Sequence, residues 1–336
     1  MPVRIRLAPP ILLLLLAPMV AEYLLGDFAV TNLAPLPVMA LLYGSGCVLV
    51  REAVRRTGGG WACFLMLALA YGLVEEGLAT QSLFNPGYMH QRLLDYGFLA
   101  APGTALPWLI YVLGLHVIWS LAVPIGLTES LFADHGDKRW LGPRGLAVFG
   151  VLYLAGLALI AAYGARQGGL TASPVQIGVV LALVAGLVGT ALLRRPPRLS
   201  GGRGAGPVRA TAPPAMTLAV CFILGSLHLL AYAMGRETLH WPWPATVAAM
   251  GLADAALLAW IAFAARDGAW RAADGWAAAM GGLLAYAWFG YLVLKALGHQ
   301  GDLVGHSLLV GGLLAIGAFA GWRAVRVGRQ LAPDVS

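Results

Sequence analysis

Four residues of this chain have the types and the spacing needed for proton-transfer chemistry. Glu75 and Glu76 are adjacent and follow an apolar run that begins at Trp61. Two neighbouring carboxylates in a medium of low dielectric constant cannot both be ionised cheaply, so we expect one of them to exchange a proton, as a general base does. His116 lies in the next apolar run, and Ser120 follows it by about one helical turn, which puts both on one helix face.

Other ionisable residues also fall inside apolar runs, and Glu22 and Lys295 lie nearer the ends of such runs. His228 is interpreted as a packing residue, or, together with His116, as an axial ligand of a haem. Asp254 lies among alanines and glycines and is expected to pair with His228 or Lys295, to mark an ion pathway, or to bond across a close helix contact. His299, Asp302 and His306 share a helical spacing that suits a metal site, although a membrane-interface face is the favoured interpretation.

The composition shows which environment these residues occupy. Hydrophobic residues make up 60% of the 336 residues and charged residues only 11%. A soluble domain carries roughly 25% charged residues, so this chain has too few charges to cover a surface that faces water. The sequence therefore predicts a polytopic membrane protein. The net charge of +7 does not indicate a nucleic-acid partner, because the basic residues cluster in loops.

The predicted fold class is an all-α transmembrane bundle of about ten spans. A span needs about 20 mostly apolar residues between charged or Gly/Pro-rich stretches. The segments that meet this test are residues 10–25, 33–50, 61–83, 106–127, 145–163, 175–193, 216–234, 245–265, 276–297 and 303–322.

The distribution of Lys and Arg predicts the orientation. Of the 22 basic residues, all but four lie in one set of alternating loops and at the two termini; the exceptions are Arg92, Arg166, Arg236 and Lys295. The positive-inside rule then places both termini in the cytoplasm of a cell that carries the protein in its inner membrane. The first segment resembles a signal peptide, but its apolar run continues to Leu25, and we expect it to remain as a helix.

One stretch of the chain divides it into two halves. Residues 194–215 are rich in Arg, Gly and Pro, which predicts a flexible cytoplasmic linker. Residues 1–193 then form a six-helix half that carries the Glu-Glu/His site, and residues 216–336 form a four-helix half.

The predicted third and fourth spans are antiparallel neighbours, and a helix rises about 1.5 Å per residue. Glu75 and His116 then lie at depths in the membrane that differ by roughly 6 Å, which side chains can bridge.

The carboxylate pair and the histidine resemble the motifs of a known group. A Glu-Glu pair late in one span with a histidine in the next is similar to the CAAX-prenyl-protease type II superfamily, which includes the CPBP-like intramembrane glutamic proteases. The resemblance covers about the first 130 residues. Thr80 stands at the family's Arg position, and Val112 stands at its Phe position. The resemblance implies that one Glu activates a water while histidine supports the oxyanion.

The function predicted from these residues is therefore an intramembrane, metal-independent peptidase of the glutamic type. Glu75, Glu76, His116 and Ser120 are its expected catalytic residues. No cofactor and no metal are expected, and the expected partners are the lipid bilayer and a membrane-embedded peptide or protein substrate. Two alternatives remain open: a proton-coupled transporter that uses Glu75, Glu76 and Asp254, and a non-catalytic membrane scaffold.

Overall fold

The computed structural model describes residues 3–136, 138–167, 169–193, 212–266 and 270–330. Within these ranges the chain is almost entirely helical, because long apolar stretches can satisfy their backbone polar groups in a bilayer only by forming helices. Its strands are β1 (Phe98–Leu99) and β2 (Thr104–Ala105), which pair antiparallel in the loop before the fourth span.

The helices of the N-terminal half are long rods that change from α-helical to π-helical geometry at particular residues. In chain order the elements are α1 (Val3–Pro18), η1 (Met19–Tyr23), α2 (Leu36–Met39), η2 (Ala40–Gly44), α3 (Ser45–Thr57), α4 (Gly60–Val74), η3 (Glu75–Ala79), η4 (Tyr88–His90), α5 (Leu106–Leu115), η5 (His116–Ala122), α6 (Val123–Leu131), η6 (Ala133–His135), α7 (Pro143–Gln167) and α8 (Pro174–Leu193). Of these, η1, η2, η3 and η5 are π-helical.

The C-terminal half contains four long helices. They are α9 (Pro214–Ala233), which continues into the π-helical η7 (Met234–Thr238), then α10 (Trp243–Ala264), α11 (Ala272–Ala296) and α12 (Leu303–Gln330), with η9 (Gln300–Asp302) before the last.

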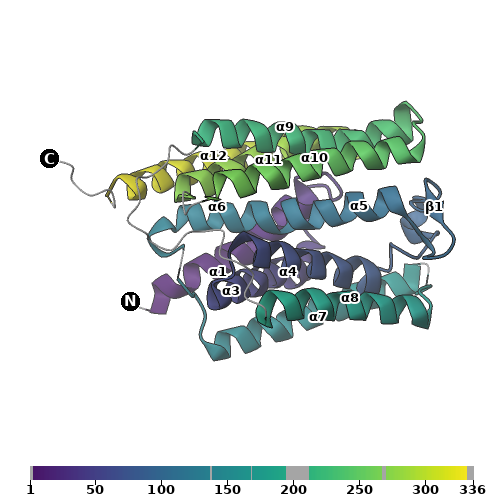
Figure 1. Cartoon of the computed structure of the whole chain (residues 1–336), viewed down its shortest axis with the longest axis horizontal. Coiled ribbons are helices and arrows are strands. Elements are labelled where there is room, and N and C mark those ends of the chain that lie inside the picture. The colour runs from purple at the N-terminus through teal and green to yellow at the C-terminus, as the bar shows by residue number, and fades with distance from the viewer. Residues whose placement is uncertain (1–2, 137, 168, 194–211, 267–269, 331–336) are drawn as a thin grey trace.

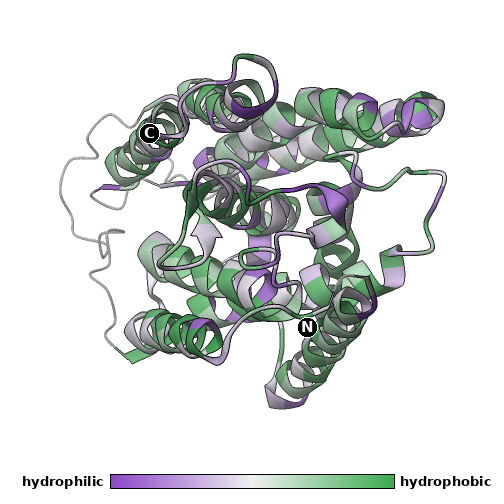
Figure 2. Ribbon diagram, turned by 90° about the vertical axis from the view of Figure 1, so that its right-hand side faces the viewer, coloured by the Kyte–Doolittle hydropathy of each residue, from purple (hydrophilic) through white to green (hydrophobic). Residues whose placement is uncertain are grey.

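The predicted fold class is confirmed: the protein is an all-α polytopic membrane bundle. Among the described residues, nine helices are long and apolar enough to cross a membrane, and the apolar helix Leu7–Tyr23 is a shorter tenth. The described ends of α1 and α12 lie at the same end of the bundle, as an even number of crossings requires (Figure 1). Viewed along the bundle, apolar residues cover most of the helical ribbon and many polar residues lie in the connecting loops (Figure 2).

The third span ends earlier than the sequence predicts. The predicted segment runs to Leu83, whereas the helix stops at Ala79. The chain turns because Gln81 adopts a left-handed backbone, with φ of 54°, and because the Thr80 hydroxyl donates back to the Glu75 carbonyl at 3.1 Å. This turn keeps Ser82 beside Glu76 instead of continuing the helix outward.

The helices are arranged in layers (Figure 1). α9, α10, α11 and α12 form one side of the bundle, α7 and α8 form the opposite side, and the fourth span, α5 to α6, runs between them with α1, α3 and α4. α11 packs on α9, α12 and α6, while α8 packs on α4 and α7 packs on α3 and η2. The fourth span therefore contacts both halves of the chain.

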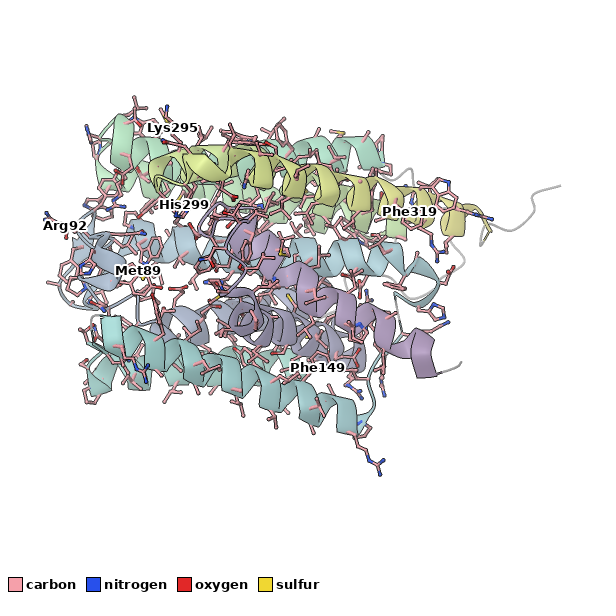
Figure 3. The ribbon with its side chains drawn as sticks, turned by 180° about the vertical axis from the view of Figure 1, so that it is seen from behind. Met89, Arg92, Phe149, Lys295, His299 and Phe319 are labelled. Carbon is pink, nitrogen blue, oxygen red and sulfur yellow. The ribbon has the colours of Figure 1, made fainter. Side chains whose placement is uncertain are left out.

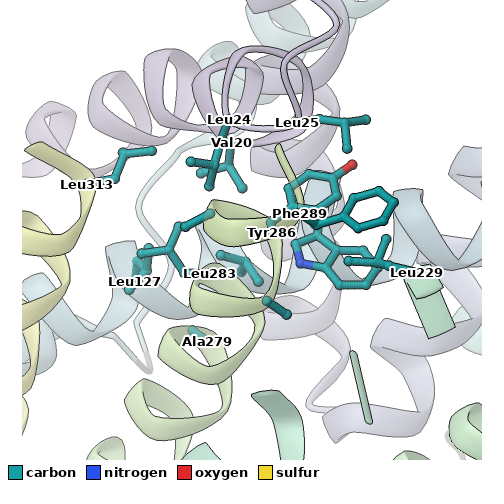
Figure 4. Packing of buried hydrophobic residues seen from close by; sticks show 14 of the residues in the cluster. Val20, Leu24, Leu25, Leu127, Leu229, Ala279, Leu283, Tyr286, Phe289 and Leu313 are labelled. Atoms are coloured by element: carbon teal, nitrogen blue, oxygen red, sulfur yellow. The ribbon is translucent and has the colours of Figure 1, made fainter. Parts of the chain in front are cut away.

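The largest apolar core lies between the halves. Val20 and Leu24 from the first span meet Leu127 of α6 and Leu283 and Tyr286 of α11 (Figure 4). A second core around Leu13, Leu42 and Phe149 holds the first, second and fifth spans together. Since these cores fix α1, η2 and the fourth span relative to one another, they also fix the polar residues that those elements carry.

The two ends of the bundle differ in charge. At the end that holds the described termini, called the basic end here, Arg51 is buried and bonds Glu129 at 2.9 Å, Glu52 at 2.7 Å and the Gly136 carbonyl at 2.6 Å. Met89, Arg92, Lys295 and His299 lie at the opposite end (Figure 3). The predicted linker, residues 194–215, lies outside the described residues as far as residue 211.

Candidate functional site

Glu75 and Glu76 begin a π-helical turn in the interior of the protein. Their side chains are only 2% and 6% exposed, so neither points into solvent at a helix end. Neighbouring residues of an α-helix point about 100° apart. A π-helical turn contains more residues, which reduces that angle and lets two adjacent side chains face the same neighbouring helix. Both carboxylates face His116 in this way.

His116 lies between the two carboxylates. Its Nε2 is 2.8 Å from Glu76 Oε1, and its Nδ1 is 3.6 Å from Glu75 Oε2. Ser120 Oγ lies 3.3 Å from the same Nδ1, and the ring of Tyr43 stacks on the imidazole with centroids 6.1 Å apart. The structure therefore brings together all four residues that the sequence singled out, Glu75, Glu76, His116 and Ser120.

The two carboxylates have different surroundings. Glu76 Oε2 accepts hydrogen bonds from the hydroxyls of Ser82 and Thr80, the latter at 3.1 Å, while its Oε1 bonds the imidazole. Three partners hold this carboxylate in place and favour its ionised form. Glu75 Oε2 is buried and has no hydrogen-bond partner. Glu75 is therefore the carboxylate with a free lone pair.

Glu75 lines a cavity of about 120 Å³. A water molecule needs only about 10–15 Å³ of such volume, so the cavity has room for several waters. Its wall is built from the first, second, third and fifth spans and the loop after η3; the lining residues are Glu22, Phe28, Met39, Leu42, Tyr43, Glu75, Thr80, Asn85, Tyr88, Met89, Ile160, Tyr163 and Gly164. Met89 and Tyr163 are exposed, so the cavity reaches the surface at the end opposite the basic end.

Glu22 and Tyr43 belong to this site as well. The sequence indicated Glu22 only as an ionisable residue near the end of a span, and it did not indicate Tyr43. The Tyr43 hydroxyl lies close to the carboxylates of both Glu22 and Glu75. Tyr71 faces Glu75 as well, but its hydroxyl has no hydrogen bond of good geometry. Glu22 lies near the end of the first predicted span, and its spacing from Glu75 says nothing about their proximity. The signal that the sequence offered for Glu22 was an acidic residue within an apolar helix.

The site coincides with the π-helical turns. In the described part of the chain, five segments are π-helical, and four of them carry site residues: η1 carries Glu22, η2 carries Tyr43, η3 carries both glutamates and η5 carries His116 with Ser120. Such turns are rare and are found often at functional sites. Their convergence on one group of polar residues is evidence for function that is independent of residue type.

Outside the spanning segments, Tyr88 closes the cavity from the loop. Burial, together with the nearby Glu76 and Glu22 carboxylates, raises the pKa of Tyr88. Its hydroxyl therefore stays protonated and remains available as a hydrogen-bond donor. Asn85 also lines the cavity, but its side chain is already hydrogen-bonded to the backbone. Nδ2 donates to the Gly169 carbonyl at 3.3 Å, and Oδ1 accepts from Gly87 N at 2.9 Å.

The site residues also suit a metal ion. Within the described residues, Glu75, Glu76 and His116 form a group whose ligand atoms lie within 4.8 Å of one another. His299, Asp302 and His306 do not form such a group there. Asp302 accepts from the backbone amides of Val30 and Thr31, and this contact holds the loop after the first span against η9, just before α12.

The remaining polar residues of the spans form a separate pair. Asp254 Oδ1 lies 2.8 Å from His228 Nδ1, as one of the sequence interpretations proposes. His228 Nε2 lies 3.3 Å from the Tyr111 carbonyl oxygen, so both ring nitrogens are engaged. His116 is engaged on both sides too, so a haem iron would have to displace a contact of each imidazole.

Comparison with known proteins gives a family. A family model described as an uncharacterized membrane protein family matches residues 11–271. The chain belongs to this family. The match covers all the site residues and extends through α10, whereas α11 and α12 lie beyond its end. No curated protein and no solved structure matches the chain significantly.

The geometry thus provides one free carboxylate at a cavity, one clamped carboxylate, and an imidazole between them. Such a set can take a proton from a water molecule and pass a proton to a leaving group, provided that the reacting bond reaches the cavity.

Proposed function

We propose that this protein is an intramembrane hydrolase of the glutamic type, and that its substrates are peptide bonds within or next to a membrane-spanning segment. The observation that carries the proposal is the buried carboxylate of Glu75, which lines the cavity and whose Oε2, without a hydrogen-bond partner, lies 3.6 Å from the His116 imidazole. The resemblance of the Glu-Glu pair and His116 to CPBP-like proteases supports the same chemistry.

In the proposed reaction, Glu75 takes a proton from a water in the cavity while the water oxygen attacks the peptide carbonyl carbon. The tetrahedral species then breaks its C–N bond, and the leaving amine receives a proton from the acid formed on Glu75 or from His116. Glu76 acts as a positioning residue, since its bonds from Ser82 and Thr80 fix the carboxylate that orients the imidazole. Ser120 supports the other side of the ring.

Placement in the cell is part of the proposal. The basic end faces the cytoplasm of an inner cell membrane, following the positive-inside rule, and the cavity then opens on the external side. The site residues all belong to the half formed by residues 1–193. The half formed by residues 216–336 packs against the fourth span through α11 and α12.

The test is peptide hydrolysis by the purified protein in liposomes that contain a library of single-span peptides, with new peptide termini read by mass spectrometry. Wild-type protein is expected to cleave, and Glu75→Gln and His116→Ala are each expected to lose at least about 100-fold in rate, the usual contribution of a positioned acid or base. Asp254→Asn is the matched control and should cleave at the wild-type rate. The chelator 1,10-phenanthroline should leave the rate unchanged; inhibition would replace the metal-independent mechanism with one that uses a metal at Glu75, Glu76 and His116.

A proton-coupled carrier is the second candidate, and the Asp254–His228 pair in the second half favours it. A carrier would depend on Asp254 as well as on the glutamates. Equal loss of function in Asp254→Asn and Glu75→Gln, without any cleaved peptide, would establish the carrier and overturn the hydrolase.

A further inference from the structure

The cavity has an acidic wall without a basic counterpart. Glu22 and Glu75 both line it, and among the described residues its lining includes no Lys, Arg or His. The imidazole nearby is already bound to Glu76. An ionised carboxylate is costly in a membrane interior unless it is paired, so a cation in the cavity would relieve both acids.

One acceptor in this wall requires a donor. Glu75 is 2% exposed and lines the cavity, and its Oε2, on the side of His116, has no hydrogen-bond partner. Leaving a buried acceptor without a partner is unfavourable, and a group that brings N–H donors would satisfy it. A protonated primary amine carries both the charge and three such donors.

The rest of the lining is aromatic. The rings of Phe28, Tyr43, Tyr88 and Tyr163 border the same volume. Aromatic faces attract ammonium groups through their quadrupole, and cages of this kind are a common way to bind amines. The cavity, about 120 Å³, is somewhat smaller than an apolar cavity of about 150 Å³ that accepts benzene, so it fits an ammonium group with a short carbon chain.

From these observations we infer that the cavity is a binding site for a small protonated primary amine, held by Glu22 and Glu75 and enclosed by the aromatic side chains. The amine enters past Met89 and Tyr163, the exposed residues of the lining. This inference goes beyond hydrolysis, because binding is measured without turnover and is expected even if no peptide is cleaved.

The test measures the thermal unfolding midpoint of the full-length, detergent-purified protein during titration with n-propylammonium chloride. A ligand that binds the native state raises the midpoint in a saturable way. The uncharged isostere 1-propanol and sodium chloride are the matched additives, and neither is expected to raise it saturably. An equal rise with sodium chloride would assign the site to inorganic cations and overturn the amine.

Two pairs of variants locate the site. Glu22→Gln is expected to weaken the apparent affinity about tenfold or more, whereas Asp254→Asn, which changes an acid outside the cavity, should bind as wild type does. Tyr163 is exposed, so its replacement leaves the core intact. Tyr163→Leu should weaken binding severalfold, and Tyr163→Phe, which keeps the ring, should not. Unchanged binding in both Glu22→Gln and Tyr163→Leu would overturn the proposed site.

The amine can belong to a soluble molecule or peptide, or to a lipid headgroup. Titration in phosphatidylcholine nanodiscs with and without phosphatidylethanolamine separates these sources. A smaller shift in the presence of phosphatidylethanolamine would show that the lipid amine already occupies the cavity, and equal shifts would assign the site to a soluble or peptide amine.

Discussion

At the scale of single residues, the site depends on giving two adjacent glutamates different surroundings. Glu76 bonds the imidazole and two hydroxyls, while Glu75 lines the cavity and has one oxygen without a hydrogen-bond partner. This difference comes from Thr80 and Ser82, which turn back on Glu76 where the helix ends. If the helix continued regularly past Glu76, the two glutamates would lack this difference in hydrogen bonding and would be similar acids.

Ser82 is the residue that tests this arrangement most simply. It is fully buried and bonds both Glu76 and the Trp108 Nε1–H, the latter at 3.2 Å. Ser82→Ala leaves a buried donor and a carboxylate lone pair without partners, and we expect it to lower the free energy of unfolding by about 1–3 kcal/mol.

Ser307→Ala is the matched control for this change. Ser307 accepts from Tyr291 at 3.1 Å but is exposed, so its loss is expected to alter stability by less than about 0.5 kcal/mol. Both values can be measured by unfolding the protein from bicelles with SDS. Equal stability of the two variants would show that Ser82 does not support Glu76.

At the scale of the elements, the sequence predicted the spans well but not their internal geometry. The spacing of apolar runs located every spanning helix, although the second continues to Thr57 and the third stops at Ala79. The expected contact between the third and fourth spans is present in the structure. The π-helical turns at Glu22, Tyr43, Glu75 and His116 were not predictable, because a π-helical turn depends on contacts between helices and has no clear local pattern. For the same reason Glu22 and Tyr43 were not recognised as neighbours of Glu75.

Close approach of the helices makes a second prediction at this scale. A Cβ built on Gly281 of α11 would lie 2.4 Å from the Leu218 carbonyl oxygen and 2.8 Å from the Cys221 Cβ of α9. Gly281→Ala must therefore push α9 away, and we expect a loss of about 1–3 kcal/mol in the free energy of unfolding.

Gly311→Ala provides the control, since a Cβ there meets nothing within 4 Å and alanine favours the helix. Its stability should equal or exceed that of the wild type in the same SDS titration. If Gly281→Ala is as stable as Gly311→Ala, then α9 and α11 do not pack as closely as described.

At the scale of the whole molecule, composition and charge were sufficient to predict a membrane bundle with both termini at one end. Few charges and long apolar runs leave no other fold class, and the alternation of basic loops requires an even number of crossings. The large core between the halves was not predictable, because residues such as Leu24, Leu127 and Leu283 look alike in an apolar sequence. The packing of the complete bundle decides which apolar residues face other helices and which face lipid.

The same core explains how a polar site persists inside a membrane. α1, the fourth span and α11 are fixed by apolar packing on one side of His116, and α7 closes the cavity on the other. The site residues therefore keep their positions without a charged partner for every acid, and the bundle tolerates a free carboxylate where the chemistry needs one.

The most direct measurement is a double-mutant cycle between Glu76 and His116. The free energies of unfolding of Glu76→Ala, His116→Ala and the double variant give their coupling, which we expect to be at least about 1 kcal/mol for side chains 2.8 Å apart in the protein interior. Glu76→Ala combined with Asp254→Ala is the control and should be additive. Additivity of the Glu76 and His116 changes within about 0.3 kcal/mol would contradict the site, because the carboxylate and the imidazole would then not be in contact.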